Sequence, residues 1–204
     1  MSTVTTKGVM TAEEFFDWVN RPENAGRRWE LENGEVVEMS SPGEQHSYVC
    51  WFIQTLLTDY IRARHSGHLL PNDCGLIVRR RPDTVRGPDA MVFLENRVLS
   101  QAVPGHVDRV PTLVVEVYSP SDRPGRLGRR VSQYLHRGIE MVWVVYPEDR
   151  TVDIYRPGQP VQSLEESDEM QIEDVLPGFK CKVSDLFVLP DLPMNPLNAH
   201  NSEQ

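Results

Sequence analysis

The first third of the chain alternates between helix-like and strand-like spacing of apolar residues. Thr11 followed by Glu14 forms a capping-box pattern in front of an apolar helix side. Asn33 and Gly34 form the dipeptide best suited to a two-residue type I′ turn between two strands. The next apolar residues recur three and four positions apart, which predicts a long amphipathic helix that ends near Gly67. The predicted elements are a helix over residues 11–20, strands over 28–31 and 35–39, and a helix over 45–64.

Further along, short apolar runs predict a sheet. Residues 112–118 form an almost continuous apolar run, as expected of a central strand covered on both faces. A helix ending at Gly138 separates this run from another buried strand, which predicts a right-handed crossover between two parallel strands. The remaining predictions are strands over 75–78, 89–93, 141–145 and 151–155, the last antiparallel, and a helix over 125–137.

These elements predict an α/β fold with a mixed central sheet flanked by helices, preceded by an N-terminal helix and hairpin. A chain of 204 residues can bury one sizeable core. We therefore expect a single domain over residues 1–190. Beyond Pro190 apolar periodicity is lost, so residues 191–204 are expected to form a disordered tail.

Composition and charge restrict the location and the partners. No apolar run approaches the roughly 18 residues that a membrane span needs, and residues 1–10 lack the basic start and apolar region of a secretory signal, so we expect a soluble, cytoplasmic protein. Cys50, Cys74 and Cys181 are far apart and show neither CxxC nor Cys/His spacing, which favours free thiols over disulfides or zinc. A formal net charge of −9 opposes non-specific attraction to nucleic acid. Any nucleic-acid site must therefore be local.

Glu116 is the most informative single residue. It lies inside the apolar run, on the same strand face as Val114 and Tyr118. Burying an ionised carboxylate without a partner destabilises a fold by several kcal/mol, unless the group becomes protonated. A metal ion, an arginine or a lysine must therefore lie beside Glu116. A structural ion pair with a nearby arginine is the alternative to a metal role.

Asp89 is the second candidate, because it follows Pro88 at the start of another predicted strand. By itself, Pro-Asp is a common turn pair. Two carboxylates on neighbouring strands that face the same way, however, supply the hard oxygen ligands that Mg²⁺ and Mn²⁺ prefer. The two residues together therefore indicate a metal site.

The chain contains, in order, Arg28-Trp29-Glu30-Leu31, Asn33-Gly34-Glu35, His46, Pro88-Asp89, Glu116-Val117-Tyr118-Ser119-Pro120, Tyr134, Gly138 and Trp143. This series of short elements resembles the bacterial Uma family of the PD-(D/E)XK restriction-endonuclease-like superfamily. The resemblance spans roughly residues 11–155 and implies a Mg²⁺- or Mn²⁺-dependent endonuclease, a hydrolase of DNA phosphodiester bonds. It implies that Asp89, Glu116, Glu30 and the backbone carbonyl of Val117 bind the metal.

The chain departs from this pattern at the superfamily lysine. Tyr118 occupies the usual place, two residues after the acidic residue, and the alternative place on the following helix, four residues before Tyr134, holds Arg130. An arginine binds phosphate bidentately but cannot deprotonate to activate water. Arg130 is therefore expected to stabilise charge on the phosphate. Two other functions stay open: a catalytically impaired nuclease-fold protein that binds nucleic acid or protein, and a metal-dependent hydrolase of another substrate.

Secondary candidates surround these residues. His46 begins its helix on the apolar face, where a histidine is either a hydrogen-bonded core residue or a neighbour of the metal cluster. Tyr118 and Tyr134 are second-rank site residues. A basic set of arginines offers a local surface for DNA or forms a solvated face. Separately, the exposed hairpin is compatible with a homodimer. The basic set comprises Arg79, Arg80, Arg81, Arg126, Arg129, Arg130 and Arg137.

Overall fold

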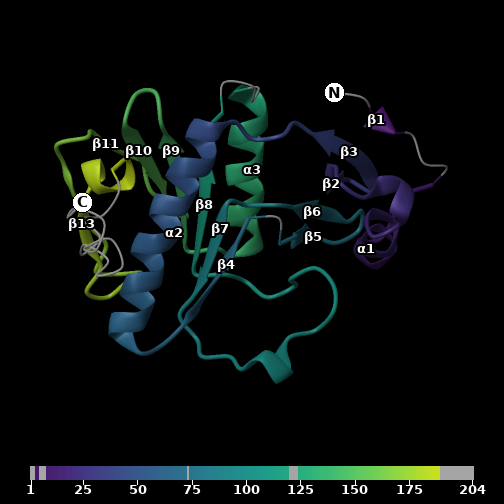
Figure 1. The fold of residues 1–204 in the computed structure, drawn as a ribbon, viewed down its shortest axis with the longest axis horizontal. Helices are drawn as coiled ribbons and strands as arrows, with labels where there is room; N and C mark the ends of the chain where they lie inside the picture. The colour runs from purple at the N-terminus through teal and green to yellow at the C-terminus, as the bar shows by residue number, and fades with distance from the viewer. Residues whose placement is uncertain (1–2, 5–7, 73, 120–123, 189–204) are drawn as a thin grey trace, which may run out of the picture.

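The computed structural model describes residues 3–4, 8–72, 74–119 and 124–188 (Figure 1). The predicted tail over residues 191–204 lies outside this part of the chain. Short 3-10 turns occur at Pro22–Asn24, Leu99–Gln101 and Val183–Leu186. Among the described residues, no helix has both the length and the apolar character needed to cross a membrane. The helices are α1 (Ala12–Val19), α2 (Glu44–Arg64) and α3 (Pro124–Arg137).

A mixed six-stranded sheet forms the centre of the fold, with strand order β11-β10-β9-β8-β7-β4. Strands β8 and β9 are parallel and α3 connects them, whereas the other neighbours pair antiparallel. The predicted crossover and the α/β class are thus confirmed. The strands are β4 (His68–Pro71), β7 (Ala90–Phe93), β8 (Leu113–Val117), β9 (Met141–Tyr146), β10 (Thr151–Tyr155) and β11 (Gln162–Leu164).

Helices α2 and α3 cover opposite faces of this sheet (Figure 1). Side chains of β8 alternate between the faces: Val115 and Val117 pack with the apolar residues of α2, and Val114 packs with those of α3. Burial on both faces explains why β8 reads as a continuous apolar run. By the same alternation, Glu116 points to the α3 side.

A second sheet has the strand order β1-β3-β2-β6-β5, and α1 packs on it (Figure 1). Its hairpin turns at Asn33 and Gly34, which have φ angles of 53° and 79°, the positive values that a type I′ turn requires. The predicted N-terminal helix and its capping box at Thr11 and Glu14 are also confirmed. The strands are β1 (Thr3–Val4), β2 (Arg28–Glu32), β3 (Glu35–Met39), β5 (Leu76–Arg79) and β6 (Thr84–Arg86).

Several short elements were not predicted from the sequence. Strand β4 is a half-buried edge strand, and β6 has three residues, so neither shows a long alternating pattern. Helix α2 ends at Arg64, close to the end expected near Gly67, and the residue that caps it, His65, has a left-handed φ of 55°. A small sheet of β12 (Glu169–Gln171) and β13 (Lys180–Lys182) follows the central sheet.

Candidate active site

A cavity of about 400 Å³ brings the predicted site residues together, with walls from both large sheets and from α2 and α3. The four charged residues predicted from the sequence each come from a different segment. Strand β2 supplies Glu30, the residue before β7 is Asp89, β8 supplies Glu116 and α3 supplies Arg130. Val117 and His46 also line the cavity. Residues distant in sequence therefore share one polar space.

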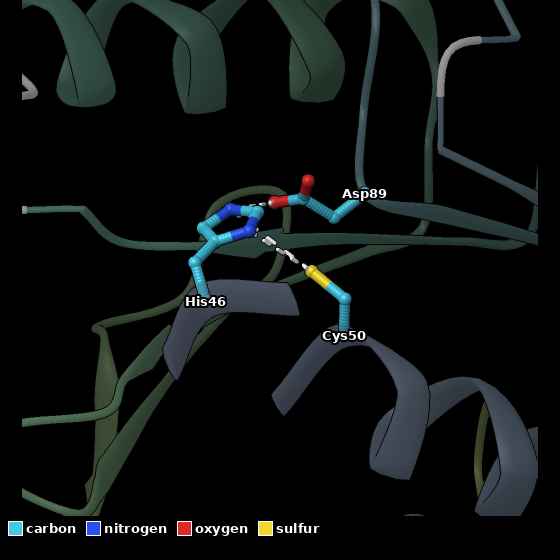
Figure 2. Close-up of side chains that lie close together, drawn as sticks. All are labelled: His46, Cys50 and Asp89. Carbon is cyan, nitrogen blue, oxygen red and sulfur yellow. Dashed lines mark hydrogen bonds and ion pairs between the residues drawn. The ribbon is translucent and has the colours of Figure 1, made fainter. Parts of the chain in front are cut away.

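Asp89 is held between β8 and α2. Its Oδ2 atom accepts a hydrogen bond of 2.7 Å from the backbone N–H of Val117 and lies 3.3 Å from Nε2 of His46 (Figure 2). Its Oδ1 atom accepts a hydrogen bond of 3.3 Å from the Asn72 side chain. The Asp89 carboxylate is only 7% exposed, so these contacts fix its orientation.

Glu116 lies against α3. The hydroxyl of Tyr134 donates a hydrogen bond to its Oε1 atom, and Nη1 of Arg130 lies 3.3 Å from its Oε2 atom. Arg130 and Tyr134 are four residues apart, which places them on the same side of the helix. Burial, reinforced by the charge of Asp89, raises the pKa of the Glu116 carboxyl to about 7, although Arg130 acts in the opposite direction. The arginine pair expected as one alternative for Glu116 is therefore present.

Glu30 lies among guanidinium groups. Its Oε2 atom accepts a hydrogen bond of 2.9 Å from Arg86, and its Oε1 atom accepts one of 3.1 Å from the backbone N–H of Gly87. Arg130 also donates to Oε1, and Nη2 of Arg126 lies 3.5 Å from Oε2. Burial would raise the pKa of Glu30, but Arg130 and Arg86 outweigh it and hold that pKa below its usual value. Arg130 thus bridges Glu30 and Glu116.

The three carboxylates share a cavity without converging on one point. Within the described part of the chain, His46, Cys50 and Asp89 form a group of potential metal ligands whose donor atoms all lie within 4.8 Å of one another. Neither Glu30 nor Glu116 belongs to such a three-residue group among the described residues. The cavity therefore presents a carboxylate pair bridged by Arg130 and a separate mixed-donor group at Asp89.

Sequence reasoning missed two of these residues. Arg86 is fully buried and pairs with Glu30 from the short strand β6. Cys50 follows His46 by four residues in α2, so the absence of Cys/His spacing inferred from the sequence was wrong for a helix. The signal was present, because residues 45–64 were predicted to be helical. Cys50, Cys74 and Cys181 form no disulfide in the structure.

The other secondary candidates lie outside the main cavity. Tyr118 contacts the ring of Tyr146 with 5.4 Å between ring centroids and lines a neighbouring pocket of about 100 Å³, together with His46. Several of the arginines expected to meet DNA are paired with carboxylates of the chain. These pairs are Arg80 with Glu13, Asp83 and Asp108, Arg129 with Glu32, and Arg137 with Asp108.

Comparisons with known proteins agree with this fold. The model of the Uma2 family, described as "Putative restriction endonuclease", matches residues 12–184. Among solved structures, "a putative nuclease belonging to DUF820" from Anabaena variabilis ATCC 29413 is similar, with a TM-score of 0.70 and 20% sequence identity. That match covers 87% of this chain and 97% of the other. A search of curated proteins gave no match. The restriction-endonuclease-like fold expected from the sequence is confirmed.

Proposed function

Because this chain belongs to the Uma2 family, whose description is that of a restriction endonuclease, we propose that it hydrolyses DNA phosphodiester bonds with Mg²⁺ or Mn²⁺. One observation carries the proposal: Asp89, directly before β7, and Glu116, on the neighbouring strand β8, are buried and line the same cavity as Arg130. Buried acidic groups beside a cation are typical of sites where phosphate chemistry takes place.

The donor chemistry of this cavity fits a hard divalent ion. Asp89 and Glu116 offer carboxylate oxygens, the donors that Mg²⁺ and Mn²⁺ prefer, and we propose Val117 as a carbonyl ligand. The metal role expected for Glu30 stays a prediction from the family resemblance, because both of its oxygens contact donors of the chain. Burial raises the pKa of Glu116, which indicates that Arg130 only partly offsets the buried negative charge. When bound, the ion would polarise a phosphoryl oxygen and lower the pKa of a water molecule.

The chain's own groups then have distinct tasks. The Arg130 guanidinium binds phosphate oxygens and stabilises the charge that develops on them, because it stays protonated and presents a planar fork of donors. Tyr134 fixes the orientation of the Glu116 carboxylate through its hydroxyl. His46 and the backbone N–H of Val117 orient Asp89. These contacts preorganise the cavity before substrate binds.

A second candidate function is favoured by the same arginine. Arg130 contacts both Glu30 and Glu116, so substrate phosphate must compete with two buried carboxylates for it. A nuclease-fold protein that binds nucleic acid without cutting it fits that arrangement. Cleavage and binding assays separate the two candidates.

The test is nicking of supercoiled plasmid by the parent protein with Mg²⁺, Mn²⁺ or EDTA. We expect nicking that depends on the metal, its loss in Asp89→Asn, and its retention in the matched control Glu38→Gln, whose partly exposed side chain pairs with Arg27 at 3.7 Å. Circular dichroism should show that both variants are folded. Nicking in EDTA, or undiminished nicking by Asp89→Asn, would refute the metal-dependent mechanism. A shift in the electrophoretic mobility of the plasmid, without nicking, would favour the binding function.

A further inference from the structure

His46, Cys50 and Asp89 bring three different donor types together at one edge of the main cavity (Figure 2). His46 and Cys50 lie on successive turns of α2, and Asp89 approaches from the start of β7. Nε2 of His46 lies 3.3 Å from Oδ2 of Asp89 and 4.0 Å from Sγ of Cys50. Nδ1 of His46 lies nearer to that sulfur, at 3.4 Å, so the ring lies between the other two side chains (Figure 2). One nitrogen, one sulfur and one oxygen donor nevertheless all lie within 4.8 Å of one another.

We propose that His46, Cys50 and Asp89 form a binding site for a transition-metal ion of the Zn²⁺ or Co²⁺ class. Such ions bind imidazole, thiolate and carboxylate together, whereas Mg²⁺ disfavours sulfur. Metal-ligand bonds of about 2.0 to 2.3 Å in a tetrahedral site imply roughly 3.3 to 3.7 Å between ligand atoms. The His46–Asp89 separation of 3.3 Å already has this value. Metal binding would draw Cys50 closer, since its sulfur lies 4.0 Å from Nε2 of His46 and all donor atoms lie within 4.8 Å of one another.

The surroundings of the group support metal binding. Asp89 is oriented by the Val117 N–H and the Asn72 side chain, as carboxylate ligands in metal sites commonly are. Cys50 is buried, while His46 and Asp89 line the cavity, so an ion and a water ligand can reach the group from one side. Three protein ligands plus an accessible position are typical of catalytic rather than closed structural zinc sites.

This site goes beyond the proposed function, because it uses Cys50 and does not require hydrolysis. It shares Asp89 with the oxygen donors proposed for Mg²⁺ or Mn²⁺. Cobalt binding through sulfur can therefore fail while Mg²⁺-dependent nicking stands, and plasmid nicking can fail while cobalt binds. The two proposals are tested by different readouts.

The experiment is a titration of the full-length, chelator-treated protein with Co²⁺, followed by absorbance. Coordination through sulfur gives an ultraviolet thiolate-to-cobalt charge-transfer band, which we expect at one equivalent of metal. Cys50→Ser should remove the band, and Cys74→Ser, which changes another free thiol, should keep it. Zn²⁺ competition against a chromophoric chelator should show at least about tenfold weaker binding in Cys50→Ser.

A second variant keeps the test decisive if Cys50→Ser fails to fold. His46→Gln retains the thiol and should also weaken Zn²⁺ binding at least about tenfold, with its fold checked by circular dichroism. Absence of the charge-transfer band in the parent, or a band that persists in Cys50→Ser, would overturn the proposal. Unchanged Zn²⁺ affinity in His46→Gln would do the same and leave His46 as a hydrogen-bonding residue between Cys50 and Asp89.

Discussion

Replacing Glu30 with glutamine distinguishes two roles for this buried carboxylate. If Glu30 belongs mainly to a group of mutually repelling acids, the neutral amide should leave the metal-free protein as stable as the parent or more so. If it mainly anchors the arginines, its loss leaves Arg86 and Arg130 without their shared partner. The geometry favours the second outcome, because both Glu30 oxygens contact cationic or N–H donors.

The expected loss follows from burial. The side chains of Glu30 and Arg86 are 3% and 0% exposed, and removal of one partner from a buried ion pair costs about 3 to 5 kcal/mol. Arg86 keeps a contact of 3.4 Å with Glu32, and Arg130 keeps Glu116, so we expect the lower end of that range. With a urea dependence of about 2 kcal/mol per molar, a loss of about 3 kcal/mol lowers the midpoint by about 1.5 M.

Urea unfolding followed by tryptophan fluorescence measures this loss in Glu30→Gln. The control Glu38→Gln removes a carboxylate from the adjacent strand, where the ion pair with Arg27 is largely accessible to solvent, with side chains 34% and 58% exposed, and should cost less than about 1 kcal/mol. Both variants are measured in EDTA so that metal ions do not contribute. A Glu30→Gln midpoint equal to or above that of the parent would refute the anchoring role.

Two further predictions follow. Burial lowers the pKa of His106 from 6.5 to about 4; the charge of Arg80 adds to this effect and the charge of Glu13 opposes it. The unfolded chain therefore binds a proton that the folded protein does not, and stability should fall as the pH drops from 6.5 towards 4. Because the ring is partly exposed, we expect the free energy of unfolding to be about 1 to 2 kcal/mol lower at pH 5 than at pH 7, as measured by urea unfolding. If His106→Leu loses as much stability between these pH values as the parent, the reasoning is wrong. Arg130→Lys should lower the melting temperature by several degrees, because one ammonium cannot match both buried carboxylates that the guanidinium contacts. An unchanged melting temperature would show that one contact suffices.

Elements defined by local chemistry were predictable from the sequence. The capping box at Thr11 and the Asn33-Gly34 turn each depend on neighbouring residues, and both occur as expected. The parallel pair β8 and β9 followed from two apolar runs separated by a helical segment. Strand β6 was missed because its three residues show no alternating pattern. They are buried through long-range pairing, which includes Leu31 with Val85.

The candidate site was predictable where a single residue contradicted its surroundings. Glu116 interrupts a buried apolar strand, so its need for a partner was evident from the sequence. Arg86 was not recognisable, because arginine is usually exposed and its burial depends on Glu30, which is distant in the chain. From the sequence, Arg80 was grouped with arginines that contact DNA or solvent. Its ion pairs were not predictable, because the carboxylate partners come from three different segments.

The bridge that Arg130 makes between Glu30 and Glu116 also sets an order of assembly during synthesis. Glu30, Asp89 and Glu116 all leave the ribosome before α3, whose Arg130 lies 100 positions after Glu30. A growing chain that ends at β8 therefore contains every acidic group of the cavity but lacks the guanidinium that joins two of them. The charged cavity reaches its final form only after the crossover helix has been made.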